Sequence, residues 1–210
     1  ELSNLPGEAK MNIASLIFDT MGIYWTMKFT NEKDKNLLAE WNLKNQNLPV
    51  KVFVPYGHYK DYLERGIPVD KTFALNVSEM TAEDWVITFG LGIIDPVAVL
   101  IERIISKLTG KNFGLDNIIG DIEKDSKAEK DIKNAAAALF EAANSWGVFA
   151  KSDKDATNVS ELINPGMTSV LDLSVYNSVG AFNVRALVIS LISRKIFNHR
   201  MDARKKEEVD

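Results

Sequence analysis

The sequence has 210 residues, 46% of them hydrophobic and 26% charged, which is the balance of one globular domain with room for an insertion. It contains no cysteine, and this excludes disulfide frameworks, cysteine nucleophiles and thiolate metal sites. The formal net charge of -4 argues against a protein covered in positive potential for wrapping nucleic acid.

The chain opens with a strand pattern followed by a helix pattern. Residues 12–18 form an apolar run that ends at Asp19 and breaks at Gly22, which is typical of a buried strand leading into a loop. A helical period follows at 32–43 and places leucine and tryptophan side chains on one face and charged side chains on the other.

Two more strand patterns follow. Residues 50–54 are apolar and β-branched and are closed by Pro55, and residues 72–75 are a shorter candidate. Strand, helix and strand in succession predict a parallel α/β unit, so the fold class is α/β with helices flanking a parallel sheet.

The middle of the chain has helical texture. Thr81 with Asp84 three residues later predicts a helix start, and Asp95 before Pro96 predicts the cap of a helix over 96–109. A further helix is predicted across the alanine-rich stretch that ends near residue 145. Together these patterns predict an all-helical insertion.

The last part returns to strand texture at 168–173 and then predicts a long helix over 178–205. Six basic residues gather at the end of that helix. They are Arg194, Lys195, Arg200, Arg204, Lys205 and Lys206. These cations suit a solvated helix C-terminus, because the helix dipole favours positive charge there. The other interpretation is a local nucleic-acid contact.

Signatures of common active sites do not occur in this sequence. The single Gly110-Lys111 pair lacks the glycine five positions earlier that a phosphate loop needs, and no G-x-G-x-x-G is found. His58 has no second histidine at metal-ligand spacing, so no metal site is predicted. No apolar stretch approaches the roughly 20 residues of a membrane span, and no signal peptide opens the chain. We therefore expect a cytoplasmic protein without a membrane partner.

Three aspartates end apolar runs or precede a helix: Asp19, Asp95 and Asp172. Ligands of parallel α/β sheets bind beyond the carboxyl ends of strands, which makes Asp19 and Asp172 better placed for a site than surface carboxylates. Capping or turn formation is the structural alternative for all three residues. Asp19 is the candidate catalytic residue, because the resemblance described next also points to it.

The string SLIFDTMGIYWTMKF, followed by a helix and KVFVPYG, resembles the stretch after the phosphate loop in archaeal HerA-like ATPases, a DNA-translocating P-loop family. FGLGIIDPVAVLIERIISKL is similar to the helical insertion of that family, and the segment from TSVLDL to FNHR is similar to the strand and long helix before its Walker B strand. The resemblance covers essentially the whole chain. Where the family reads D-P-x-G-E, the chain keeps Asp19 and Gly22 but has Ile23 in place of the second acid.

This resemblance implies a partial RecA-like P-loop NTPase fold, with residues 1–90 as the first part of the α/β core, 91–165 as the helical insertion and 166–210 as the return to the core. It implies that the phosphate loop and the Walker B strand lie outside this chain. The complete parent would use ATP and Mg²⁺, move double-stranded DNA and assemble as a homo-oligomeric ring. No cofactor is expected in this chain alone, and Asp19 would orient water or magnesium in the parent.

Two alternatives of other classes stay open from the sequence. One is a noncatalytic module whose helical region binds a protein partner. The other is a DNA-binding domain that uses the basic end of the last helix.

Overall fold

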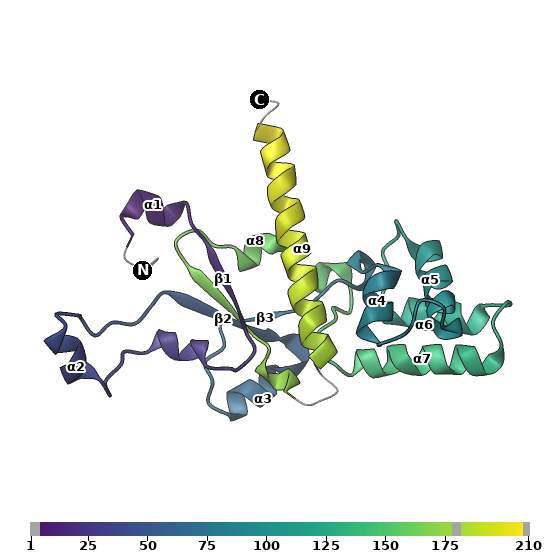
Figure 1. The fold of residues 1–210 in the computed structure, drawn as a ribbon, viewed down its shortest axis with the longest axis horizontal. Helices are drawn as coiled ribbons and strands as arrows, with labels where there is room; N and C mark the ends of the chain where they lie inside the picture. Colours follow the sequence, from purple (N-terminus) through teal and green to yellow (C-terminus); the bar gives the residue numbers. More distant parts are fainter. Residues whose placement is uncertain (1–4, 178–181, 208–210) are drawn as a thin grey trace. The chain divides into compact units, whose positions relative to one another are not determined.

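The computed structural model describes residues 5–177 and 182–207, and the chain divides into two compact units (Figure 1). Unit 1 combines Glu1–Thr72 with Ser160–Asn177, and unit 2 combines Phe73–Val159 with Ser178–Asp210. The predicted insertion at 91–165 differs from this division. Unit 2 starts earlier because Trp85 packs against aromatic side chains farther along the helical region, and it also contains the last helix.

The α/β part is built on a four-stranded parallel sheet flanked by helices. The strands are β1 (Ser15–Asp19), β2 (Val50–Pro55), β3 (Lys71–Phe73) and β4 (Thr168–Asp172), in the order β1-β4-β2-β3. The strand that comes last in the sequence therefore lies between the first two. Thr168 of β4 is the register partner of Ser15 on one side and of Val50 on the other.

The burial of the strands follows their place in the sheet. β2 and β4 are buried almost throughout, as expected for parallel strands covered on both faces. β1 has an equally apolar run but is only half-buried up to its last residue. The strands predicted at 50–54 and 168–173 are confirmed within a residue. Those predicted at 12–18 and 72–75 are confirmed with shifted bounds.

Unit 1 contains short helices around the sheet. They are α1 (Gly7–Met11), η2 (Tyr24–Lys28), α2 (Lys35–Glu40), η3 (Tyr56–His58), α3 (Tyr59–Glu64) and η6 (Ser174–Tyr176). A further helix, α8 (Val159–Leu162), begins one residue before the second segment of unit 1, which starts at Ser160. Val52 and Val54 of β2 form a buried cluster with Tyr62 of α3, and Trp25 of η2 packs against it. The connections β1–β2 and β2–β3 both run in the same direction across the sheet. Right-handed crossovers therefore place η2 and α3 on the same face.

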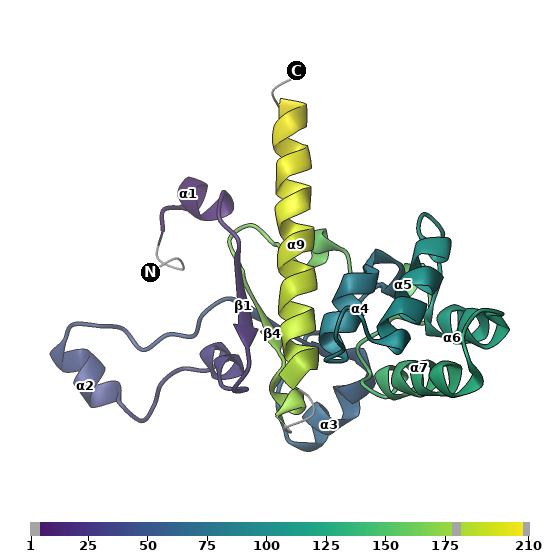
Figure 2. The same cartoon turned by 45° about the vertical axis from the view of Figure 1, so that its right-hand side comes forward.

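The connection from β1 to β2 carries an arm, which we define as residues 29–47. Its two ends meet where the Leu48 N–H donates to the Met27 carbonyl at 2.8 Å. The helix predicted over 32–43 is present as the shorter α2, but its apolar face is not buried: Leu37 is 53% exposed and Trp41 73% exposed. In Figures 1 and 2 the arm extends away from the strands of unit 1.

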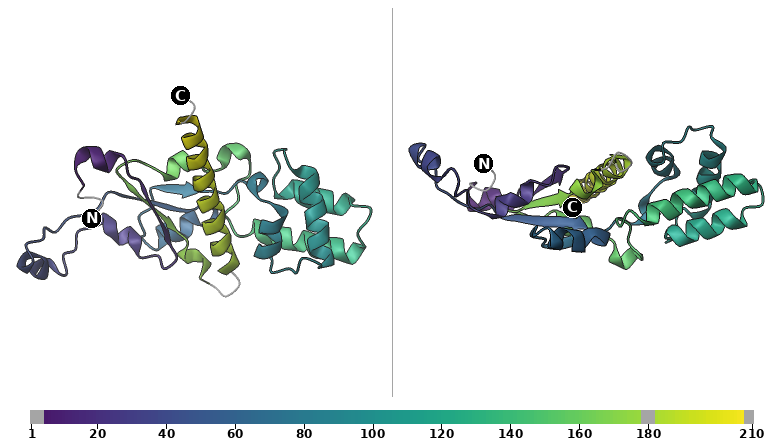
Figure 3. Two further views of the ribbon diagram at one scale, coloured as in Figure 1. Left: turned by 45° about the horizontal axis from the view of Figure 1, so that its top comes forward. Right: turned by 90° about the horizontal axis from the view of Figure 1, so that it is seen from below.

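Unit 2 is helical and has an aromatic core. Its helices are η4 (Val77–Glu79), α4 (Ala82–Thr88), α5 (Pro96–Leu108), α6 (Leu115–Lys124), α7 (Lys130–Asn144), η5 (Asp153–Asp155) and α9 (Phe182–Glu207). Trp85 of α4 is fully buried, with its ring centroid 4.9 Å from that of Phe140 and 5.3 Å from that of Phe149. The pairing of α6 with α7 can be followed in Figure 3.

The helix starts in unit 2 follow the capping residues of the sequence. Thr81 and Asp84 form a reciprocal capping box at α4, as predicted. Asp95 accepts a hydrogen bond from the Val97 N–H at 2.8 Å and so caps α5. Of the two interpretations of Asp95, capping is the one that the structure confirms.

The long C-terminal helix is confirmed as α9, except that residues 178–181 of the predicted 178–205 lie outside the described part of the chain. α9 packs against α4 within unit 2 through buried side chains such as Leu187 and Val188. None of the helices among the described residues, α9 included, combines the length and apolar character needed to cross a bilayer.

Replacing Asp95 by alanine removes the side-chain acceptor at the start of α5. We expect the free energy of unfolding to fall by about 1 kcal/mol, which is the usual cost of losing an N-cap. Urea denaturation of this chain measures the change. Glu102→Ala, on the exposed surface of the same helix, is the matched control and should change stability by less than about 0.5 kcal/mol. Equal losses in the two variants would refute the capping assignment.

Candidate functional site

Two aspartates end adjacent strands at the carboxyl edge of the sheet. Asp19 is the last residue of β1, Asp172 is the last residue of β4, and the two are register partners. Partners in a parallel pair point to the same face, so the two side chains lie beside each other. Both are 0% exposed. This edge is the place where open parallel sheets bind ligands.

The Asp19 carboxylate organises the loop that follows β1. Oδ1 accepts the N–H groups of Met21 at 3.1 Å and Gly22 at 2.8 Å. Oδ2 accepts those of Ile23 and Tyr24, both at 2.8 Å. Four donors match the roughly four acceptor positions of a carboxylate. The predicted catalytic residue therefore holds residues 20–24, which we call the β1 loop, and in this conformation it has no spare acceptor position for water or magnesium.

Asp172 has a different environment from its partner. Its Oδ1 accepts hydrogen bonds from the Tyr62 hydroxyl at 3.0 Å and from the Ser174 N–H at 2.9 Å. Its Oδ2 is buried and has no hydrogen-bond partner among the described residues. Burial raises the pKa of the Asp172 carboxyl above its usual value. Hydrogen bonds from Ser174 and Tyr62 oppose that rise, and the Asp19 charge adds to it.

Gly22 lets the β1 loop lie directly on the turn that follows β4. Its φ of +71° is in the left-handed region that favours glycine. A Cβ at this position would lie 2.5 Å from Ser174 Oγ and 3.5 Å from Asp172 Oδ2. The glycine is therefore required both by the backbone conformation and by the close approach.

A histidine lies close to this edge, in the segment that follows β2. The Nδ1 atom of His58 is 2.9 Å from Asp61 Oδ2, and the ring of His58 meets that of Tyr176 edge-on, with centroids 5.5 Å apart. Sequence reasoning considered His58 only as a metal ligand and missed this arrangement. The described residues contain no group of three or more histidines and carboxylates placed to hold a metal ion. A histidine paired with a carboxylate is a candidate for proton transfer.

The six basic residues of the last helix do not form one set. Arg194 makes two hydrogen bonds to the Asp84 carboxylate, at 3.0 and 2.6 Å, and Lys195 binds Glu79 at 2.8 Å. These two cations join α9 to other parts of unit 2. The others lie exposed on the last turns of the helix: Arg200, Arg204, Lys205 and Lys206.

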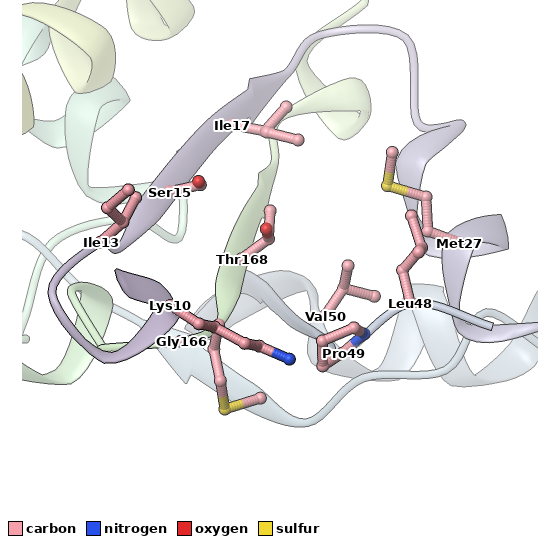
Figure 4. Close-up of a pocket in the computed structure, with 11 residues that line it drawn as sticks. Lys10, Ile13, Ser15, Ile17, Met27, Leu48, Pro49, Val50, Gly166 and Thr168 are labelled. Atoms are coloured by element: carbon pink, nitrogen blue, oxygen red, sulfur yellow. The ribbon is translucent and has the colours of Figure 1, made fainter. Parts of the chain in front are cut away.

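A groove of about 370 Å³ lies at the opposite, amino-terminal ends of the strands in unit 1 (Figure 4). Ile17 of β1, Val50 of β2 and Met27 of η2 are among the apolar side chains that line it. Lys10 is the charged residue in its lining. Because ligand sites of such sheets lie at the carboxyl ends, this groove is not where the candidate site is expected.

Comparison with known proteins gives no family assignment: no protein-family model matches the chain, and no curated protein matches it significantly. The functional argument therefore rests on the geometry of the two aspartates and of the strands that carry them.

Replacing Asp19 by asparagine should destabilise unit 1 strongly. The amide keeps one acceptor oxygen but turns an NH₂ group toward backbone donors, which leaves buried N–H groups unpaired. We expect a loss of roughly 3 kcal/mol in the free energy of unfolding, since hydrogen bonds to charged groups contribute about 1.5–3 kcal/mol each. Chemical denaturation of this chain gives the value.

The control for this variant is Asp202→Asn, at an exposed position of α9. Its stability should stay within about 0.5 kcal/mol of the unmodified chain. An Asp19→Asn protein as stable as this control would show that the four hydrogen bonds contribute little to the stability of the fold.

Proposed function

We propose that this chain is the central part of an ATP-dependent, DNA-translocating ATPase of HerA-like, RecA-type architecture. The parallel sheet with flanking helices is compatible with that fold class. The resemblance of SLIFDTMGIYWTMKF and TSVLDLSVYN to that family falls on the two strands whose ends carry Asp19 and Asp172. The family likeness therefore coincides with the candidate site.

The observation that carries this proposal is the free edge of β1. The Ser15 N–H donates to Met167 and the Asp19 carbonyl accepts from Leu173, so alternate residues of β1 face β4. The backbone groups of Leu16 and Phe18 then face the open side, since a parallel strand alternates its bonding direction. An apolar strand with an open edge is a liability in a finished sheet, which supports a larger sheet in which another strand covers β1.

The residues of this chain do not by themselves fit a nucleotide. No phosphate-loop pattern occurs in the sequence, and the four acceptor positions of Asp19 are filled by its own loop. ATP and Mg²⁺ are therefore assigned to segments of the parent outside this chain. Asp19 has the role of a positioning residue here, because it fixes the loop at the edge of the sheet.

One observation favours the alternative of a protein-interaction module. The turn before α5 exposes Ile93 and Ile94, which are 83% and 92% exposed, and Ile87 and Val99 are also exposed nearby in the sequence. Apolar side chains gathered at one turn are typical of a contact surface. This surface belongs to the helical unit, where sequence analysis placed the interaction.

Nucleotide binding and the free edge can be tested together. Calorimetric titration of this chain with MgATP should give no heat of binding, whereas a gene product that includes the phosphate loop should bind. In that longer protein, hydrogen exchange should show the Leu16 and Phe18 amides newly protected, because a strand then covers them.

The Ser15 and Ile17 amides face β4 in both proteins and are the internal reference. If Leu16 and Phe18 exchange equally fast in the longer protein, no strand is added at this edge and the proposal fails. MgATP binding by the 210-residue chain itself would also contradict it.

DNA binding by this chain should be weak and carried by the exposed end of α9. Reversing Arg200, Lys205 and Lys206 to glutamate should weaken it further and lower the slope of log K against log salt by about 0.9 per lost phosphate contact. Filter binding of duplex DNA at several salt concentrations measures both quantities.

The comparison variant is Lys195→Glu, which removes the ion pair with Glu79 inside unit 2. It should lower stability and leave the salt slope unchanged. Tight, salt-resistant binding that survives the triple reversal would show that this helix end is only a solvated surface.

A further inference from the structure

We propose that Asp19 and Asp172 form a carboxyl pair that binds one proton, that Asp172 carries this proton on Oδ2, and that the proton keeps the β1 loop closed over the end of β4. The inference concerns residues of this chain alone. It does not depend on nucleotide hydrolysis.

The groups that donate hydrogen bonds to the pair within the described part of the chain are uncharged, and His58 at the same edge pairs with Asp61. Asp19 receives only backbone N–H groups of the β1 loop. Asp172 receives the Tyr62 hydroxyl from α3 and the N–H of Ser174 at η6. Tyr176 of η6 is the next titratable group, and it interacts electrostatically with Tyr62. Two ionised carboxylates side by side in a buried site repel each other, so such pairs normally retain a proton.

The hydrogen bonds decide which partner holds the proton. Both oxygens of Asp19 accept two N–H groups, so a proton on either oxygen would face a backbone donor. Asp172 accepts these two hydrogen bonds on Oδ1, and its buried Oδ2 has no hydrogen-bond partner in the part of the chain that the structure describes. A proton on Oδ2 leaves both bonds to Oδ1 intact and removes the charge from the unpaired atom. Asp172 is therefore the neutral acid of the pair.

The proton is linked to the β1 loop through Gly22. This residue donates to Asp19 Oδ1 and approaches the turn after β4 so closely that a Cβ built on it would lie 2.5 Å from Ser174 Oγ and 3.5 Å from Asp172 Oδ2. Its carbonyl accepts the indole N–H of Trp25 at 2.9 Å. Ionisation of Asp172 places a second negative charge beneath the loop. Opening of the loop, which admits water to the pair, is the structural change that relieves the repulsion.

The sign of the pH dependence follows from the raised pKa. The folded chain binds the Asp172 proton more tightly than the unfolded chain does, so the proton stabilises the fold fully at pH values below the unfolded pKa. The stabilisation is lost as the pH rises through the folded pKa of Asp172. Ordinary ion-paired aspartates have the opposite dependence.

Asp172→Asn tests the proposal, because asparagine has the shape and hydrogen-bonding capacity of the neutral acid and cannot ionise. In the unmodified chain, stability should fall as the pH rises above the ordinary aspartate pKa of 3.8, and the variant should lack this component. Infrared spectra at neutral pH should contain the carbonyl band of a protonated carboxyl group, and the variant should lack it. Asp95→Asn, at the half-buried cap of α5, should keep both properties.

A second variant, with a different structural effect, keeps the proposal testable if the Asp172→Asn chain does not fold. Tyr62→Phe removes a hydrogen bond that lowers the pKa of Asp172. The pH at which stability is lost should therefore move upward in this variant. In the unmodified chain, hydrogen exchange of the Met21 to Tyr24 amides is corrected for the intrinsic exchange rate at each pH. The corrected exchange should accelerate over the pH range in which stability falls. The Asp172→Asn chain should not show this acceleration.

Three results would overturn the proposal. One is an unmodified chain without a protonated carboxyl band at neutral pH. Another is an Asp172→Asn chain with the same pH slope as the unmodified chain. The third is a β1 loop whose corrected exchange is independent of pH. All of these measurements are made without nucleotide, so their outcome is independent of whether the parent is an ATPase.

Discussion

The hydrogen bonds of Asp19 are the constraint on which the carboxyl edge of this protein depends. A buried carboxylate is costly unless its acceptor positions are filled, and four consecutive donors of the β1 loop fill them. This requirement fixes the path of the chain from β1 into η2 and brings Gly22 onto Ser174. The β1 loop and the start of η2 are thus set by the Asp19 side chain, while the turn after β4 is held by Asp172.

The same constraint explains why adjacent aspartates have different chemistry. Both oxygens of one carboxylate accept backbone N–H groups, whereas one buried oxygen of its partner has no hydrogen-bond partner among the described residues. The difference arises from the chain order, because β4 is placed between β1 and β2 by a long excursion through unit 2. A sheet built in sequence order would separate the two side chains. The topology therefore creates the pair that the local sequence does not contain.

Local patterns predicted the elements well, and long-range relations poorly. The strand at β2, the cap at Asp95 and the α4 capping box depend on neighbouring residues, so their signals are present in short windows of sequence. The pairing of Asp19 with Asp172, and of Arg194 with Asp84, joins residues far apart in the chain and requires the fold to be known. The periodicity around Leu37 predicted a helix correctly but did not indicate whether anything covers its apolar face. Asp19 was identified as important from its place at a strand end, although its bonds to the β1 loop depend on backbone angles that residue types do not specify.

The arm closed by the Leu48–Met27 hydrogen bond has a consequence for how this sequence can vary. Because the two ends meet at a fixed point beside the sheet, the length of chain between them is not set by the distance that it must span. Doubling a flexible loop costs only about 0.6 kcal/mol of closure entropy, which is small beside the burial of β2. Insertions and deletions between residues 29 and 47 are thus tolerated by the sheet. We expect a graft engineered into this segment to leave the carboxyl edge undisturbed.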